Sequence, residues 1–296
     1  MKERDSLVGS LFDIISLSKN IIMKVLIFGK GYVAHQFQDF YGGEAVISDL
    51  RIEDISKLKE EIQKESPDVV INCAGKTGRP NVDWCEDHKM ETLSSNVTAP
   101  LILAQACSDL NVYMVHVGSG CVYEGYNDDE GFSESDEPNF DGSFYSRTKA
   151  WSEASLAELP VLQLRLRMPL DGKPGPRNFV TKITKYEKVI NIPNSISVME
   201  DFLSAAAQLI EKRATGIFNM TNPGVIDHAS ILDIYKEVVD PNFTYEIFSV
   251  EEMEKITKAR RSNCGLSSKK LEAEGIHMRP VEEAVRAALI EYASHL

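Results

Sequence analysis

The stretch "KVLIFGKGYVAHQF" (residues 24–37) decides how the rest of this sequence is interpreted. A continuous apolar run, typical of a buried parallel strand, ends at Gly29, and a helix is expected from about Tyr32. Gly29, Gly31 and Ala34 form a G-x-G-x-x-A pattern. In such a pattern the glycines allow a tight turn and a close approach of pyrophosphate, and the third small residue lets helix and strand pack together. The stretch predicts a dinucleotide-binding turn, although an ordinary tight turn between strand and helix remains the alternative.

The same strand–helix rhythm continues along the chain. Further strand-like runs occupy residues 44–48, 68–75, 112–120 and 161–169, and helical patterns lie between them at 55–65, 99–110 and 143–159. Alternation of this kind predicts an α/β fold with a doubly wound parallel sheet. Ligands bind to such sheets at the carboxyl ends of the strands, where this sequence places several glycines and polar residues.

The alternation stops after Pro169, which divides the chain into two expected parts. We expect residues 23–168 to form an NAD(P)-binding Rossmann domain, to which residues 196–225 return. Residues 169–195 and 226–296 are expected to form a smaller C-terminal substrate-binding lobe. Residues 1–22 are interpreted as an N-terminal extension, because their apolar stretch is short and contains Asp13. Residues 124–142 are rich in acidic residues, Gly and Ser, and are expected to form a long loop.

Composition excludes several classes of function. The 296 residues carry a formal net charge of −13, whereas a nucleic-acid-binding protein normally presents a basic patch. After the extension no segment is apolar over the length that a membrane-spanning helix needs. The five cysteines are odd in number and widely spaced, which predicts neither a disulfide framework nor a metal site. Together these features favour a cytoplasmic protein that binds no metal.

Four polar residues are expected to meet beside the glycine turn. Ser119 ends the fourth predicted strand, and Tyr145 and Lys149 lie on one face of the following predicted helix. Asn96 precedes the helix before that strand. A nearby ammonium group favours ionisation of a phenol, so Tyr145 is expected to exchange a proton at a carbonyl or alcohol while hydride moves. An amphipathic helix without catalytic function would also place a tyrosine and a lysine four residues apart.

Two residues near the end of the second strand give opposite indications about the cofactor. Asp49 lies where an acid would bond the adenosine ribose of NAD, whereas Arg51 would hold the 2′-phosphate of NADP. Arg51 favours NADPH, and NADH is the alternative. The expected cofactor-binding residues are Gly29, Lys30, Gly31, Tyr32, Val33, Asp49, Arg51, Ala74, Gly75, Asn96, Tyr145 and Lys149.

Several longer stretches carry a closer likeness. They are "CAGKTGRPNVDWCE" (73–86), "NFDGSFYSRTKA" (139–150), "RLRMP" (165–169), "PRNFVTKI" (176–183), "YEKVINIPNS" (186–195) and "FNMTNPGVI" (218–226). With the glycine turn and the serine, tyrosine and lysine, they make the chain resemble the extended short-chain dehydrogenase/reductases from about Met23 onwards. Within that superfamily it is most similar to the nucleotide-rhamnose synthases, and next to the dTDP-4-dehydrorhamnose reductases. The glycine turn is one residue shorter than is usual in that family.

The resemblance implies an enzyme with an extended-type Rossmann fold and a defined reaction. It implies 3,5-epimerisation and 4-reduction of a nucleoside-diphosphate 4-keto-6-deoxyglucose to an NDP-L-rhamnose, with UDP favoured as the nucleotide and dTDP as the alternative. It adds Cys121 and Lys182 to the catalytic residues as the acid/base pair, with the order of action open. A buried cysteine and a solvated lysine are the plain alternatives for these two residues. A 4-reductase without epimerase activity and a non-catalytic regulatory subunit are the alternatives for the whole chain.

The resemblance also indicates residues that contact the substrate. Residues 76–84 are expected to form a loop that faces the sugar, Asn178 to bond the diphosphate, and Arg261 to pair with a phosphate oxygen. The expected partners are the nucleotide sugar, a separate 4,6-dehydratase that supplies it, and a second copy of the chain in a homodimer. The expected substrate-binding residues are Thr77, Arg79, Asn81, Asp83, Asn178 and Arg261.

Overall fold

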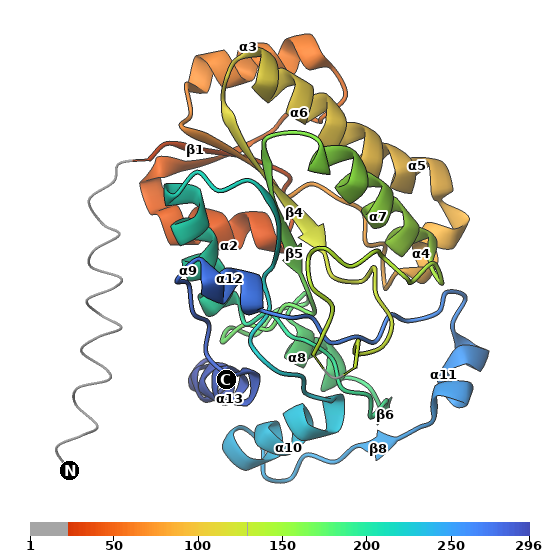
Figure 1. Cartoon of the computed structure of the whole chain (residues 1–296). Helices are drawn as coiled ribbons and strands as arrows, with labels where there is room; N and C mark the ends of the chain where they lie inside the picture. The colour runs from red at the N-terminus through yellow and green to blue at the C-terminus, as the bar shows by residue number, and fades with distance from the viewer. Residues whose placement is uncertain (1–22, 129) are drawn as a thin grey trace, which may run out of the picture.

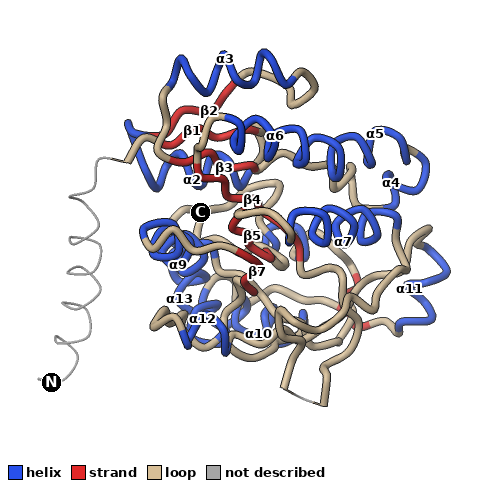
Figure 2. Tube along the Cα trace, turned by 45° about the horizontal axis from the view of Figure 1, so that its top comes forward, coloured by secondary structure: helices blue, strands red, loops and turns tan. Residues whose placement is uncertain are grey.

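A computed structural model describes residues 23–128 and 130–296, so the predicted extension at residues 1–22 lies outside the described residues. Within them, six parallel strands form one sheet in the order β2-β1-β3-β4-β5-β7 (Figure 2). The strands are β1 (Val25–Phe28), β2 (Ala45–Ser48), β3 (Val69–Asn72), β4 (Tyr113–Ser119), β5 (Val161–Leu166) and β7 (Gly216–Asn219). This arrangement confirms the predicted doubly wound α/β fold.

The central strands are buried on both faces, which explains their continuous apolar sequences. Every residue of β1 and β3 is buried. Residues at the ends of neighbouring strands lie in register, so that Phe28 of β1 is opposite Asn72 of β3, and Asn72 is opposite His116 of β4. The carboxyl ends of these strands therefore meet along one edge of the sheet.

The strand order fixes the position of a crevice. β1 pairs with β2 on one side and with β3 on the other. The chain therefore runs in one direction along the sheet from β1 to β2, and then crosses back past β1 to reach β3. A crevice opens at such a reversal, outside the carboxyl ends of the two strands, and ligands of doubly wound folds bind there. In this chain Gly29 follows β1 and residues 73–75 follow β3.

Helices cover the two faces of the sheet (Figure 1). One face packs against α2 (Tyr32–Tyr41) and α9 (Met199–Glu211), whose buried side chains include Phe37 and Phe202 in edge-to-face contact. The other face packs against α3 (Ile55–Glu65), α6 (Ala99–Asp109) and α7 (Phe144–Ala157). The predicted helices at 55–65, 99–110 and 143–159 are confirmed to within two residues at each end.

A second apolar core lies below the carboxyl edge of the sheet. It combines side chains of α8 (Phe179–Ile183), β6 (Lys188–Val189), α10 (His228–Val238) and α13 (Val281–Ser294). By contrast, α9 and β7 contribute to the core of the main sheet. The exact boundaries of the predicted domains stay a prediction. The remaining elements are η2 (Gly42–Glu44), α4 (Asp83–Asp87), α5 (Lys89–Leu93), η3 (Ser94–Thr98), β8 (Glu246–Ile247), α11 (Val250–Ile256) and α12 (Lys269–Ala273).

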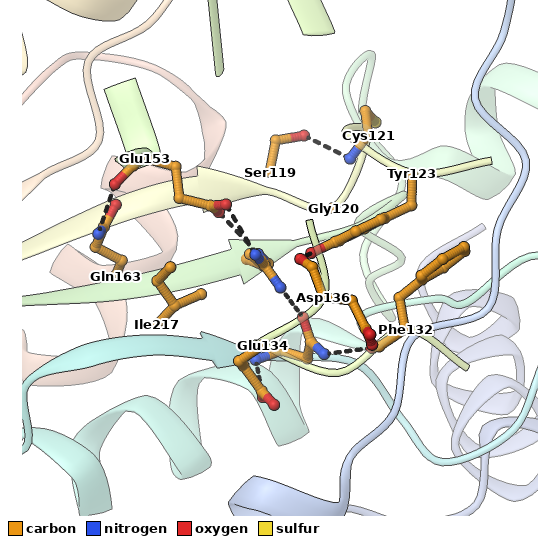
Figure 3. Close-up of polar contacts among 12 residues, drawn as sticks. Ser119, Gly120, Cys121, Tyr123, Phe132, Glu134, Asp136, Glu153, Gln163 and Ile217 are labelled. Carbon is orange, nitrogen blue, oxygen red and sulfur yellow. Dashed lines mark hydrogen bonds and ion pairs between the residues drawn. The ribbon is translucent and has the colours of Figure 1, made fainter. Parts of the chain in front are cut away.

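The long loop after β4 is held by a buried ion pair and its neighbours. Arg165 on β5 donates to both carboxylate oxygens of Glu153 on α7, at 2.7 and 2.8 Å, and to Asn219 at the end of β7. The amide of Asn219 in turn donates to the backbone oxygen of Phe132 in the loop, whose ring stacks on Tyr123. Figure 3 shows Glu153, Tyr123, Phe132 and Glu134 gathered around this network.

In the described part of the chain, no helix has the length and apolar character needed to cross a membrane. Residues 23–128 and 130–296 also contain no cluster of histidine, cysteine and carboxylate groups that would hold a metal ion.

Candidate active site

The glycine turn after β1 has the conformation that its sequence predicts. Gly29 has a φ of +104°, and a Cβ added there would lie 2.6 Å from the backbone nitrogen of Ala74, so only glycine fits. A Cβ at Gly31 would meet nothing within 4 Å, which leaves space where a pyrophosphate would approach. Gly31 is the N-cap residue of α2 and supplies no side-chain cap, while Ala34 is fully buried. The first amides of α2 therefore remain available to an anion.

The charges beyond β2 are arranged in pairs. Lys30 of the glycine turn forms an ion pair with Asp49, and this hydrogen bond lowers the pKa of the Asp49 carboxyl. Arg51 is largely exposed and its nearest ionic partner is Glu53, at 3.4 Å. Asp49 is therefore already bonded to a cation, whereas the Arg51 guanidinium is exposed and makes only a long contact with Glu53. This arrangement suits a 2′-phosphate better than a free ribose 2′-hydroxyl.

The predicted serine, tyrosine and lysine come together at the end of β4. Ser119, Tyr145 and Lys149 are all buried. The N-cap residue of α7, Ser143, accepts a hydrogen bond from Ser146, so the helix begins immediately before Tyr145. Lys149 Nζ donates to the backbone oxygen of Val117 at 3.2 Å. Burial lowers the pKa of Lys149 to about 8.

One expectation about Tyr145 is wrong. The sequence suggested that Lys149 would ease ionisation of the phenol, but the pKa of Tyr145 is raised. Burial is the main cause and the neighbouring Cys121 adds to it, whereas a hydrogen bond with Ser119 acts in the opposite direction. The phenol is therefore held in its protonated form, ready to donate.

Asn96 fixes the loop after β3. It is fully buried in the π-helical turn η3, a feature that often marks functional sites. Its side chain accepts from the backbone nitrogen of Lys76 at 2.7 Å and donates to the backbone oxygen of Lys76 at 3.0 Å and to Thr148 at 3.1 Å. A Cβ at Gly75 would lie 3.4 Å from Asn96 Oδ1 and 3.9 Å from Lys149 Nζ. Asn96 thus ties this loop to the helix that carries the predicted catalytic tyrosine and lysine.

Cys121 lies two residues beyond Ser119, and its side chain accepts a hydrogen bond from a residue that the sequence analysis did not assign to the site. Its backbone nitrogen donates to Ser119 Oγ at 3.2 Å, as Figure 3 shows. Its Sγ accepts a hydrogen bond of 2.9 Å from Nη1 of Arg167, which follows β5. Sequence reasoning gave Arg167 no role, although a charged residue next to a buried strand was a signal that it has a function or a partner.

Lys182 faces the same space from the opposite lobe. It lies on α8, and it lines the cleft together with Ser119, Cys121 and Tyr145. Burial, followed by the positive charge of Arg177, lowers the pKa of Lys182. A lysine with a lowered pKa exchanges protons more readily near neutral pH. Four of the five predicted catalytic residues therefore line one cleft, whereas Lys149 is not among the lining residues and donates to the backbone oxygen of Val117.

The predicted substrate loop contributes only part of its polar residues to the cleft. Thr77 and Asn81 line it, and so does Arg261. Asp83 accepts a 2.8 Å hydrogen bond from Arg261 Nη1 and another from the backbone, so it positions Arg261. Arg79 is exposed and does not line the cleft.

Asn178 does not have the environment expected of a diphosphate ligand. It is fully buried and caps α8, because its Oδ1 accepts from the backbone nitrogen of Val180. Its Nδ2 donates to the backbone oxygens of Asp171 and Lys173, at 2.6 and 2.8 Å. Its polar atoms are thus occupied within the protein.

These groups share a cleft of about 530 Å³ between the sheet edge and the second core. The cleft runs from Gly31, Tyr32 and Val33 of the glycine turn to Arg177 and Arg261. This volume suits a ligand of the size of a nucleotide sugar or drug-like molecule. Sequence reasoning missed Arg177, Tyr186, His228 and Arg260, which also line it.

Comparison with known proteins places the chain in a family. The family model described as the RmlD substrate binding domain matches residues 23–294. A trifunctional UDP-glucose 4,6-dehydratase/UDP-4-keto-6-deoxy-D-glucose 3,5-epimerase/UDP-4-keto-L-rhamnose-reductase of Arabidopsis thaliana is 41% identical over 283 residues, covering 92% of this chain and 42% of that protein. The chain thus spans less than half the length of that relative.

Two further similarities cover most of both partners. A bifunctional dTDP-4-dehydrorhamnose 3,5-epimerase/dTDP-4-dehydrorhamnose reductase of Arabidopsis thaliana is 42% identical over 243 residues, covering 79% of this chain and 80% of that protein. The crystal structure of the L780 UDP-rhamnose synthase from Acanthamoeba polyphaga mimivirus superposes with a TM-score of 0.85 at 33% identity. It covers 91% of this chain and 99% of that one. This chain belongs to the family of the RmlD substrate binding domain.

Proposed function

We propose that this chain is an NADPH-dependent enzyme that converts UDP-4-keto-6-deoxyglucose to UDP-L-rhamnose by 3,5-epimerisation and 4-reduction. One observation carries the proposal. Ser119, Tyr145, Cys121 and Lys182 all line a single cleft that begins at the glycine turn. A reductase needs the first two residues, but a thiol and a lysine with a lowered pKa are useful only if protons are also exchanged at carbon.

The first half of the reaction requires an enolate. Protons at C3 and C5 of the sugar flank the C4 ketone, so their removal places negative charge on the C4 oxygen. Ser119 and the protonated Tyr145 would donate hydrogen bonds to this oxygen, and these bonds strengthen as the charge develops. Cys121 and Lys182 would remove a proton from one face of the carbon and return one to the other face.

The second half uses the same hydrogen-bond donors. Bound NADPH supplies the hydride for C4, while Tyr145 gives its proton to the C4 oxygen. The raised pKa of Tyr145 is consistent with this order, because the phenol stays protonated until the oxygen becomes basic. Lys149, four residues further along the same helix, would hold the nicotinamide ribose.

The residues at the glycine turn fit a pyridine dinucleotide. The open space over Gly31 and the uncapped start of α2 suit a pyrophosphate. We propose NADPH over NADH because Lys30 already engages Asp49, while Arg51 is exposed. A 4,6-dehydratase must supply the keto sugar, and UDP is proposed over dTDP from the names of two of the relatives.

Exchange of hydrogen with solvent tests the epimerase half directly. The enzyme is incubated with UDP-4-keto-6-deoxyglucose in D₂O without cofactor, and deuterium at C3 and C5 is measured by NMR. We expect incorporation at both carbons, followed by formation of UDP-L-rhamnose when NADPH is added. Oxidation of NADPH with a previously epimerised sugar, but no deuterium at either carbon, would leave a 4-reductase alone. Cofactor binding without any turnover would indicate a regulatory subunit.

Variants of two cysteines provide a matched control. Cys121→Ser should abolish deuterium incorporation but keep reduction of a previously epimerised 4-keto sugar within a few-fold of the original rate. Cys107→Ser changes a buried thiol of α6 that does not line the cleft, and should leave both activities unchanged. Equal loss in both variants would mean that the cysteine effect is structural and would contradict the assignment.

A further inference from the structure

Arg167 is a buried cation whose surroundings are unusual. Its side chain is 1% exposed, and its two terminal nitrogens are both engaged. Nη1 donates to Cys121 Sγ at 2.9 Å, and Nη2 donates to Asn194 Oδ1 and, at 2.6 Å, to the backbone oxygen of Ser262. Apart from the thiol, every partner of the guanidinium in the described residues is a neutral oxygen.

Arg165, which lies two residues earlier on β5, has the carboxylate partner that Arg167 lacks in the described part of the chain. Arg165 is equally buried, but it forms a bidentate ion pair with Glu153. Charged groups in protein interiors are nearly always paired, because taking an uncompensated charge out of water is costly. Among the described residues, Arg167 has no carboxylate partner. The group best placed to compensate its charge is the sulfur of Cys121, as a thiolate.

The backbone around this pair is shaped to permit the contact. A Cβ at Gly120 would lie 3.3 Å from Arg167 Cδ and 2.5 Å from Leu266, so a larger residue there would displace the arginine stem. The amide of Cys121 is held by Ser119 Oγ. The thiol and the guanidinium therefore face each other in a fixed geometry, and Cys121 remains at the surface of the cleft.

We propose that Arg167 is a positioning residue that holds Cys121 as a thiolate before the substrate binds. This inference rests on the proposed epimerase function and goes beyond it, because it settles which acid/base group acts first. The thiolate takes a proton from the sugar carbon: the C–H bond breaks, an S–H bond forms, and the electron pair moves into the enolate. Lys182 then returns a proton from its ammonium group to the other face.

Other groups around the thiol do not replace Arg167. Tyr145 on α7 is protonated, and Cys264 is a buried thiol whose pKa is raised, first by burial. Lys149 on α7 exerts an electrostatic influence on Cys121, and Lys182 lines the same cleft. In the described part of the chain, Arg167 alone of the cations donates a hydrogen bond to the sulfur. Its two terminal nitrogens are engaged within the protein and its Nε is buried, which leaves the guanidinium poorly placed to bind a phosphate group of the substrate.

Alkylation of the free enzyme tests the proposal without any substrate. Iodoacetamide is applied between pH 5 and 10, and modification of the Cys121 peptide is followed by mass spectrometry, because only the thiolate reacts. We expect Arg167→Met to slow modification of Cys121 at pH 7 by about 10-fold or more, from the usual effect of a neighbouring opposite charge. Arg167→Lys should recover part of the rate. The pH at which the rate reaches half its maximum should rise in the same order.

A second variant tests the proposal without removing the guanidinium of Arg167. Asn194→Asp places a carboxylate against the same guanidinium without changing side-chain size. This competing anion should shift the alkylation profile of Cys121 to higher pH even though Arg167 is intact. If Arg167→Met does not fold, this variant and the original enzyme still give an answer. A profile for the original enzyme like that of an unperturbed thiol, or one unchanged by Asn194→Asp, would overturn the proposal.

The two proposals fail in different ways. Loss of deuterium exchange in Arg167→Met, with reduction of a previously epimerised sugar retained, would connect the thiolate to epimerisation. Absence of exchange in the original enzyme would overturn the proposed epimerase function, while the alkylation profile would still report on the thiolate. A rise in KM for the nucleotide sugar with an unchanged alkylation profile would instead make Arg167 a substrate-binding residue and overturn the inference.

Discussion

Substitutions at the two glycines of the turn should separate folding from cofactor binding. Gly29→Ala forces a side chain into a backbone with φ of +104° and places its Cβ 2.6 Å from the nitrogen of Ala74. The backbone conformation costs about 1–2 kcal/mol and the collision about 1–3 kcal/mol, so the free energy of unfolding should fall by roughly 2–5 kcal/mol. For a chain of this length that lowers Tm by roughly 3–8 °C.

Gly31→Ala is the matched control, because its added methyl group meets nothing within 4 Å and its φ is −91°. Its Tm should therefore stay within about 2 °C of the original value, while its Kd for NADPH should rise at least about 10-fold because the methyl group occupies the approach of the pyrophosphate. Tm is measured by circular dichroism without cofactor, and Kd by titration of NADPH fluorescence. A stable Gly29→Ala protein, or a Gly31→Ala protein that binds NADPH normally, would refute this account of the turn.

Three further outcomes are expected from the charges. Burial lowers the pKa of Lys149 in the folded protein to about 8, so between pH 8 and 10.5 this lysine is protonated in the unfolded chain but not in the folded one. The free energy of unfolding should therefore rise with pH over this range. Urea unfolding of Lys149→Met should lack this rise. Glu153→Gln should lower the free energy of unfolding by about 3–5 kcal/mol, because it leaves the Arg165 charge unpaired, and an unchanged urea midpoint would contradict this. Arg51→Ala should weaken NADPH binding about 10-fold with NADH binding unchanged, whereas equal weakening of both would argue against contact with the 2′-phosphate.

Apolar patterning was sufficient to predict the sheet, because strands buried on both faces leave continuous hydrophobic runs such as residues 25–28 and 69–72. The glycine turn was also predictable, since its requirement for a positive φ and a close backbone contact is local. The positions of Ser119 and Tyr145 followed from topology, because Ser119 is the last residue of β4 and Tyr145 lies in the first turn of α7, the next helix along the chain.

The roles of individual polar side chains were harder to predict, because one residue type can serve several purposes. Asn178 is of a type that binds phosphate, but asparagine is also a preferred N-cap, and the structure uses it to begin α8. The ionisation of Tyr145 was predicted in the wrong direction, because burial outweighs a nearby ammonium group and burial depends on the whole fold. Arg167 was missed because its partners come from positions 121, 194 and 262, which no local pattern connects.

The electrostatics of the cleft limit how its phenol and its thiol can act together. Burial raises the pKa of Tyr145 and the neighbouring Cys121 adds to this shift, so a negative charge on the sulfur would favour the protonated phenol. Arg167 donates its hydrogen bond to the thiol, and in the proposed mechanism this contact would place the negative charge on sulfur. When such a thiolate takes a proton, the charge would move to the C4 oxygen of the sugar, to which Tyr145 would donate. A single negative charge, passed from sulfur to oxygen, would then allow one set of residues to serve both proposed reactions.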